Sequence, residues 1–343
     1  MIRAALAVFT CLLLFITPGA RAHLEAQQDA SAAKPPRSLT AEQAAELNEA
    51  HQLNLKAVKL YQAGSYDEAL ALGKRALAIR ERVVGREDDL VLQSLINLAE
   101  IYLARKSYSD SLSLYERVLK TNEKTVGRDD ASNGPLLNVI AYLHYMMGQS
   151  FNAENYYKRA LEVSEKSTDP DSEQLATAAY NLAEFYRFTR NFKKAEALYE
   201  RALEIRDKKL GREDPRLLRT VDRFRCLYYQ SEQEKKLKAF DEMRSELCKT
   251  DCVSADVVNG RAVSLPKPPY PQEAKSIRAT GIVVVKVKID ESGKVASAED
   301  MCGGNPWLVK AATDAAREAL FTPTLLSGTP VKVTGVITYK FEL

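Results

Sequence analysis

The residues that most often do chemistry in proteins, histidine and cysteine, are few and scattered in this chain. Its three histidines, His23, His51 and His144, are too few and too widely spaced to indicate a histidine-based triad or a zinc site. The five cysteines include no C-x-x-C pair, so the sequence does not support a thioredoxin-like or zinc-ribbon site. No P-loop, G-x-S-x-G or post-strand G-x-G-x-x-G is present. We therefore expect a binding or scaffold protein that is not an enzyme and that uses no cofactor, metal or small-molecule substrate.

Length and charge narrow the class of partner. The 343 residues are enough for about two domains of ordinary size. Lys+Arg number 49 and Asp+Glu 46, for a net charge of +3, and basic residues are not interleaved with aromatic ones. Such a balance does not favour nucleic acid as a ligand. We expect the partners to be proteins or extended peptides.

The first 22 residues have the organisation of a secretory signal. Arg3 gives a positive start, 4–16 is apolar, and Ala20-Arg21-Ala22 is a small-residue cleavage site. The apolar run of about 13 residues is short against the roughly 20 that a bilayer-spanning helix needs. We expect cleavage before His23, and the alternative is an uncleaved membrane anchor.

An exported chain is free to form disulfides. Cys226, Cys248, Cys252 and Cys302 follow the signal, and four cysteines allow three pairings. Cys248 and Cys252 are closest in sequence, so we predict a disulfide between them. The alternative, that all four are free thiols, stays open.

A 42-residue repeat fills the middle of the chain. Small residues recur at this interval, each followed six residues later by Arg-Ala-Leu or Arg-Val-Leu, and a Gly-Arg-acidic turn keeps the same period. Within each unit, apolar residues recur at i, i+3 and i+4, which predicts two helices, at about 90–105 and 108–124 in one copy. Glycine at the turn is expected to end the second helix. The recurring small residues are Ala69, Ser111, Ala153 and Ala195.

The repeat resembles the tetratricopeptide repeat (TPR) in its kinesin-light-chain-like form over about residues 44–231. The segment from Asn181-Leu182-Ala183 to Arg201-Ala202-Leu203 is similar to that consensus. The resemblance implies a solenoid with a concave binding face, on which a first-helix asparagine bonds the backbone of an extended peptide. Asn97 and Asn181 occupy that position. The alternative is that each only bonds the neighbouring repeat.

The last part of the chain has a different pattern. Prolines at 266, 268, 269 and 271 mark a boundary. Alternating β-branched residues predict a strand at 281–289, a return strand at 294–298 and a final strand at 331–341. An amphipathic helix is expected from Asn305 to Leu320, with Leu308 and Leu320 inward. The result is a small α+β unit.

Short motifs run in order through this unit: Tyr270-Pro271-x-x-Ala274, Gly281-x-Val283-x-Val285-x-Val287, Asp290-x-x-Gly293-x-Val295, Phe321-x-Pro323 and Gly328-x-Pro330-Val331. With these motifs the unit resembles the C-terminal domain of TonB energy transducers over about residues 260–343. The resemblance implies a domain that adds a strand of an outer-membrane receptor to its own sheet in the periplasm, which requires an exposed strand edge. The final strand is the candidate, and its charged side chains are expected to oppose non-specific pairing. The alternative is that residues 257–263 cover its edge. The side chains expected at the docking strand are Lys332, Thr334, Val336, Thr338 and Lys340.

Together these patterns predict an all-α TPR solenoid followed by a small α+β TonB-like C-terminal domain. We expect a periplasmic adaptor that holds one protein on the solenoid and another, such as an outer-membrane receptor peptide, on the C-terminal domain. The alternatives are an inner-membrane-anchored energy transducer and a scaffold that forms a homodimer through the C-terminal domain. The predicted boundaries are 1–22 signal peptide, 23–39 linker, 40–248 solenoid, 249–264 linker and 265–343 C-terminal domain.

Overall fold

The structure is a computed structural model of the whole chain. It describes residues 39–343 except 167–168, 170, 212–213, 248–261 and 327–328. The predicted signal peptide and Cys248–Cys252 pair lie outside the described residues. The chain divides into two compact units, Met1–Pro170 and Asp171–Leu343.

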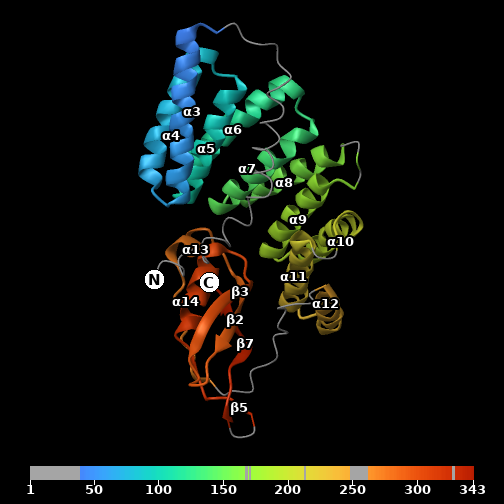
Figure 1. Cartoon of the computed structure of the whole chain (residues 1–343). Coiled ribbons are helices and arrows are strands. Elements are labelled where there is room, and N and C mark those ends of the chain that lie inside the picture. The colour runs from blue at the N-terminus through green and yellow to red at the C-terminus, as the bar shows by residue number, and fades with distance from the viewer. Residues whose placement is uncertain (1–38, 167–168, 170, 212–213, 248–261, 327–328) are drawn as a thin grey trace. The chain divides into compact units, whose positions relative to one another are not determined.

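The first unit is built from helices that pack in consecutive pairs (Figure 1). The predicted helix pair at 90–105 and 108–124 is present, with bounds that differ by at most two residues. The helices are α3 (Ala41–Gln62), α4 (Tyr66–Val84), α5 (Asp89–Ala104), α6 (Tyr108–Val126), α7 (Gly134–Met146) and α8 (Ser150–Glu165), with a 3-10 turn, η2 (Ala131–Asn133), before α7.

Local signals set the ends of these helices. Thr40 and Gln43 exchange side-chain and backbone hydrogen bonds, which forms the capping box at the start of α3. Gly85 and Gly127 end α4 and α6 with φ of 85° and 94°, a region that L side chains rarely adopt. Gly211 does not share this conformation, because α10 ends on Leu210 in an extended conformation.

Small residues and ion pairs join the repeats. The four small residues of the 42-residue period are all fully buried, as expected where paired helices approach closely. On α6, Arg117 pairs with Glu81 of α4 and donates to the Arg86 carbonyl. On α8, Arg159 makes the equivalent contacts with Glu123 and the Arg128 carbonyl. Each repeat is thereby connected to the turn and second helix of the repeat before it.

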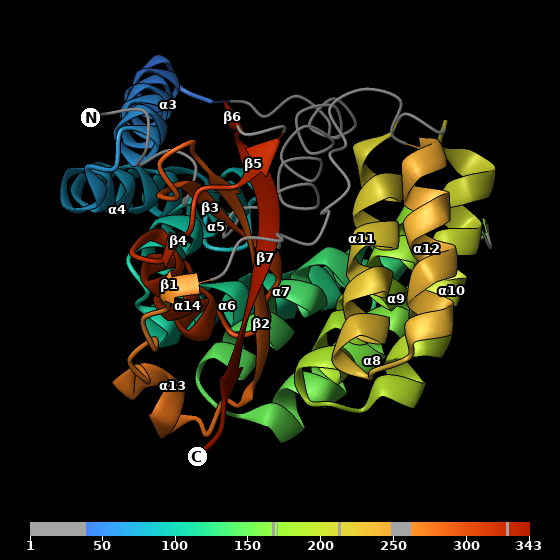
Figure 2. The same ribbon diagram turned by 90° about the horizontal axis from the view of Figure 1, so that it is seen from below.

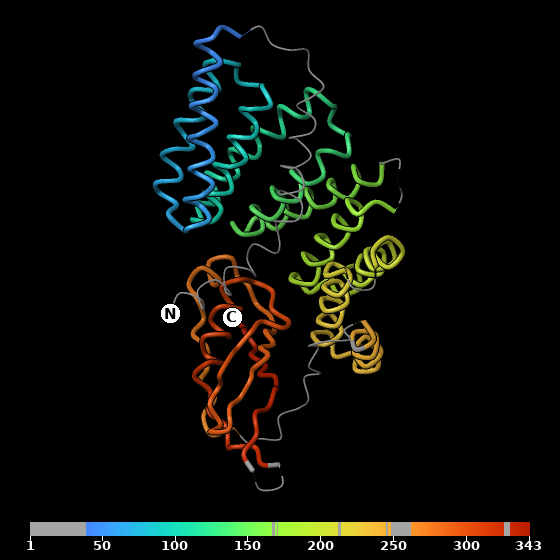
Figure 3. Tube along the Cα trace, viewed as in Figure 1, coloured from blue at the N-terminus to red at the C-terminus, as the bar shows by residue number. Residues whose placement is uncertain are grey.

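The second unit begins with four more helices, each packed on the next (Figure 3). They are α9 (Glu173–Phe188), α10 (Phe192–Lys209), α11 (Pro215–Gln230) and α12 (Glu234–Leu247). The remaining elements form the α+β part: β1 (Ala262–Ser264), α13 (Gln272–Ser276), β2 (Gly281–Ile289), β3 (Val295–Cys302), α14 (Pro306–Arg317), β4 (Leu320–Phe321), β5 (Leu325–Leu326), β6 (Thr329–Pro330) and β7 (Val333–Phe341).

The main sheet has the order β3-β2-β7, all antiparallel, and α14 covers one of its faces (Figure 2). Alternate residues of β2 and β7 point into the core against Leu308 and the alanines of α14. Three expectations are corrected. The return strand extends to Cys302 because it stays paired with β2, and the final strand starts at Val333. Leu320 is not in the helix, since α14 ends at Arg317 and Leu320 pairs with Ser264 in β4, where it is 40% exposed.

Candidate partner-binding surfaces

The edge of β7 is the first candidate surface. All nine residues of β7 pair with β2 on one side, and among the described residues no strand lies on the other. Of the segment 257–263 that was the alternative cover for this edge, residues 257–261 lie outside the described residues. Residues 262 and 263 belong to β1, which pairs with β4 instead. In an antiparallel pair, alternate residues direct their N–H and C=O groups away from the partner. β7 therefore offers a row of backbone donors and acceptors to an incoming strand.

The predicted side chains around β7 are in different environments. Thr334, Val336, Thr338 and Lys340 alternate with the core residues, as expected, but only two of these four are exposed. Val336 packs against a buried cluster that contains Cys226, and the Thr338 hydroxyl is 2.9 Å from the Tyr229 hydroxyl on α11. The four side chains are thus not equally available to a partner.

Lys332 and Lys340 place positive charge near the two ends of β7. Lys332 precedes β7, is 3.8 Å from Glu291 and is largely exposed. Lys340 is 2.6 Å from Glu342 and also exposed. Charges of this kind at an edge oppose non-specific strand pairing.

The asparagines of the solenoid form the second candidate surface. Asn97 on α5 donates from Nδ2 to Oδ1 of Asn54 on α3, at 3.1 Å, so it does bond the neighbouring repeat. Asn138 on α7 has a buried Oδ1 with no partner within the described structure. Asn181 lies on α9 and is half-buried. Asn54 and Asn138 were missed because they stand 43 residues before Asn97 and Asn181, so they are one residue out of register with the 42-residue repeat.

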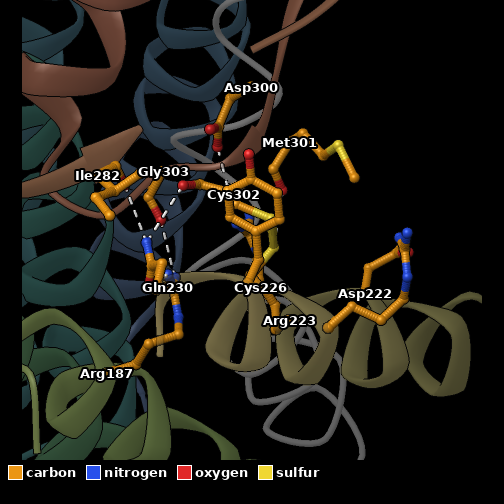
Figure 4. Close-up of a disulfide and its surroundings, with 12 residues drawn as sticks. Arg187, Asp222, Arg223, Cys226, Gln230, Ile282, Asp300, Met301, Cys302 and Gly303 are labelled. Atoms are coloured by element: carbon orange, nitrogen blue, oxygen red, sulfur yellow. Dashed lines mark hydrogen bonds and ion pairs between the residues drawn. A yellow bond between two sulfur atoms is a disulfide. The ribbon is translucent and has the colours of Figure 1, made fainter. Parts of the chain in front are cut away.

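A disulfide is the third feature, and the sequence did not indicate it. Cys226 of α11 is bonded to Cys302 of β3 (Figure 4). Both are buried, beside Val284 on the face of the sheet opposite α14. Of the three possible pairings, the one that contains this bond also pairs Cys248 with Cys252, and that second bond stays a prediction.

Buried polar groups surround the disulfide. The Arg187 guanidinium is 1% exposed and donates to both carboxylate oxygens of Glu184, to Oε1 of Gln230 and to the Gly303 carbonyl. The Tyr199 hydroxyl also donates to Glu184. The guanidinium therefore has partners from its own helix, from α11 and from the loop after β3.

Arg223 and Asp300 make a second charged contact between α11 and β3. Arg223 Nη1 is 3.8 Å from Asp300 Oδ2. Burial raises the pKa of the Asp300 carboxyl above its ordinary value, while Arg223 and Arg187 oppose that shift. Desolvation has the larger effect, so the protein lowers the acidity of this group.

None of these arrangements forms a metal site. Within the described parts of the chain, no group of three or more histidine, cysteine, aspartate or glutamate residues is placed to hold an ion. None of the described helices has both the length and the apolar character to cross a membrane.

Comparison with known proteins agrees with the helical region and, separately, with the C-terminal α+β region. The tetratricopeptide repeat family matches residues 40–124 and 134–208, and the Gram-negative bacterial TonB protein C-terminal family matches residues 266–343. No curated protein matches the chain.

Two solved structures share the helical fold. The putative kinesin light chain TPR-like repeats of Podosopora anserina match with a TM-score of 0.51 and 21% identity, over 59% of this chain and 97% of theirs. BtubC (BKLC) from P. vanneervenii matches with a TM-score of 0.53 and 21% identity, over 71% of this chain and 96% of its own. Both families are binding modules, and the TonB domain is typically associated with the cell envelope. The chain therefore contains a helical region that matches the tetratricopeptide repeat family, followed by a C-terminal region that matches the Gram-negative bacterial TonB protein C-terminal family.

Proposed function

We propose that this protein is a periplasmic adaptor that binds one protein on its solenoid and adds an extended segment of another to the edge of β7. The observation that carries the proposal is that no described strand pairs with the outer side of β7, in a domain that matches a family whose members bind by strand addition. The outer-membrane receptor peptide is the partner class that the TonB resemblance favours. The asparagines of α3, α5 and α7 support a second, backbone-directed site.

The test of strand addition is directed at the backbone. Calorimetry with the full chain is run against a panel of extended peptides from the N-terminal segments of outer-membrane receptors. A peptide that binds is then remade with alternate N-methylated amides, which remove its donors and keep its side chains. Loss of binding supports the proposal, and unchanged binding contradicts it.

Proline on β7 gives the matching test on the protein. Side chains and backbone groups both alternate along a strand, so of two adjacent positions one directs its N–H to β2 and the other to the free edge. Thr334→Pro and Val333→Pro are therefore compared, after circular dichroism has shown which of them keeps the fold. The folded one should lose peptide binding. Two copies of the chain could also pair through their β7 edges and so block peptide binding. Sedimentation of the chain without peptide shows whether such a dimer forms.

The location and the first residue of the mature protein are part of the same proposal. We propose export by a cleaved signal, with His23 first. Mass mapping of the mature N-terminus tests this, and an intact Met1 would support the membrane-anchored transducer instead.

A further inference from the structure

The helices that contact the C-terminal sheet use one defined face. We call it the asparagine face: the side of the first helix of each repeat that carries Asn97 or Asn181. Glu184 and Phe188 follow Asn181 by three and seven residues, so they lie on the same side of α9. The bounds of α11 are those of α9 plus 42 residues. Arg223, Cys226 and Gln230 therefore hold the equivalent positions on α11.

A side chain of this face, Gln230, and one next to it, Arg187, bind backbone carbonyls of the C-terminal domain. Gln230 Nε2 donates to the Ile282 carbonyl at 3.0 Å and to the Cys302 carbonyl at 3.4 Å. Arg187, one position before Phe188, donates from Nη2 to the Gly303 carbonyl at 2.9 Å (Figure 4). Three acceptors are thus recognised through the main chain. This is the kind of contact by which such a face binds an extended peptide.

The bound segment is shaped for close approach. A Cβ at Gly304 would be 3.0 Å from the Phe188 ring, tighter than ordinary contact. Val284 and Cys302 of the sheet are buried against Cys226, and Tyr229 contacts Thr338 at the same face. Without α11, apolar Val284 and Val336 would face water, which disfavours an undocked domain.

We propose that the C-terminal domain binds, within the same chain, to the asparagine face of α9 and α11. While the domain is docked there, other peptides cannot bind this face. The Cys226–Cys302 bond then retains a contact that Arg187 and Gln230 recognise without it. That the C-terminal domain occupies this face does not depend on the proposed adaptor function. The expected loss of peptide binding at this face does rest on that proposed function.

The experiment asks whether recognition survives without the covalent bond. The full chain carries Cys226→Ser and Cys302→Ser, with a protease recognition sequence inserted between Leu247 and Ala262. After cleavage, sedimentation velocity is measured at roughly 10 μM, where a micromolar complex remains mostly assembled. We expect the two fragments to sediment together. Separation at this concentration would overturn the proposal.

Matched substitutions show whether the named side chains carry the association. Arg187→Gln and Gln230→Ala should each weaken it roughly 10- to 100-fold, the effect of losing a hydrogen bond to a charged or buried group. Arg190→Gln, at an exposed arginine just after α9, and Gln233→Ala, whose amide donates to Ser231, should leave it unchanged.

The variants are also examined without cleavage. Hydrogen exchange of the uncleaved chain should become faster at 281–284 and 301–304 in Gln230→Ala and stay unchanged in Gln233→Ala. Equal effects of the paired variants would overturn the assignment. Circular dichroism before cleavage identifies any variant that has lost its helices. Gln230→Ala removes one acceptor of the buried Arg187 guanidinium but leaves its ion pair with Glu184 in place. Because no external peptide is used, this result is independent of whether β7 adds a strand.

Discussion

Arg187 and Gly303 are 116 residues apart in the sequence, yet the guanidinium of one donates a 2.9 Å hydrogen bond to the carbonyl of the other. A fully buried guanidinium must have its donors satisfied, and Glu184 alone cannot satisfy all five. The loop after β3 supplies one of the missing acceptors. Folding of the last repeats and folding of the C-terminal sheet are therefore linked through a shared polar site.

Gly303 should not tolerate a side chain. A Cβ there would lie 2.0 Å from Val309 Cγ2 and 2.5 Å from Asp300 Oδ1, so the loop would have to move away from Arg187. Gly303→Ala is expected to lower the free energy of unfolding by about 1–3 kcal/mol, as overpacking does. Urea denaturation measures the change.

The control for this substitution is Gly211→Ala. A Cβ at Gly211 meets no atom within 4 Å, and its backbone is not in the positive-φ region. Its stability should stay within roughly 0.5 kcal/mol of wild type. Similar losses in both variants would mean that the loop after β3 is not closely packed.

Asp300 should make the free energy of unfolding fall as pH rises. Its pKa is raised in the folded state, so the folded protein binds the proton more tightly than the unfolded chain does. The free energy of unfolding then falls as pH rises from the ordinary aspartate range, about 3.9, through the raised pKa. Asp300→Asn cannot ionise, so its stability should change less over this window. Thermal melts at successive pH values measure the slope.

Asp290 provides a comparison of opposite sign. Hydrogen bonds from the side chain and backbone of Ser292 and the backbone of Lys294 lower its pKa. Its contribution is present above the ordinary aspartate pKa and is lost as pH falls through the lowered value. Asp290→Asn should remove that acid-side loss. If Asp300→Asn behaved like Asp290→Asn, the Asp300 carboxyl would not be desolvated.

The Cys226–Cys302 bond should resist small reductants. Both cysteines are 1% exposed, so a thiolate reaches the sulfurs only when α11 separates from the sheet. Loss of the Gln230 hydrogen bonds should favour that opening and speed reduction roughly tenfold. The rate of reduction by dithiothreitol is measured by alkylation and mass spectrometry in Gln230→Ala and compared with the rate in Gln233→Ala. Equal rates in the two would show that reduction does not require separation.

Some features were predictable from sequence because they depend on near neighbours. The helix pair at 89–126, the capping box at Thr40 and the inward alanines of α14 follow from periodicity and local hydrogen bonds. Leu320 was misplaced because its apolar character continued the helical pattern, whereas pairing with Ser264 decides its structure.

The site residues that were missed depend on contacts distant in sequence. Nothing local distinguishes Cys226–Cys302 from the other pairings, because the bond joins residues 76 positions apart. Arg187 has a sequence position typical of an exposed last-turn residue, and only the docked sheet makes it a buried donor. Asn97 stays a predicted partner-binding residue, and its bond to Asn54 could not be foreseen because it requires the packing of two repeats.

The arginine that recurs in the Arg-Ala-Leu segment should contribute coupling between repeats. Arg159 on α8 pairs with Glu123 on α6 and donates to the Arg128 carbonyl, with the two charged side chains only 19% and 26% exposed. A partly buried pair of this kind should show a coupling energy of about 0.5–1 kcal/mol in a double-mutant cycle of Arg159→Ala and Glu123→Ala. The Lys208–Glu204 pair is exposed, lies within α10 and should show less coupling in the same cycle.

Guanidinium denaturation is unsuitable because its ions screen charge, so urea is used at low salt. If the two cycles gave equal coupling, the 42-residue recurrence of arginine would have to be explained by its carbonyl contact rather than by the ion pair.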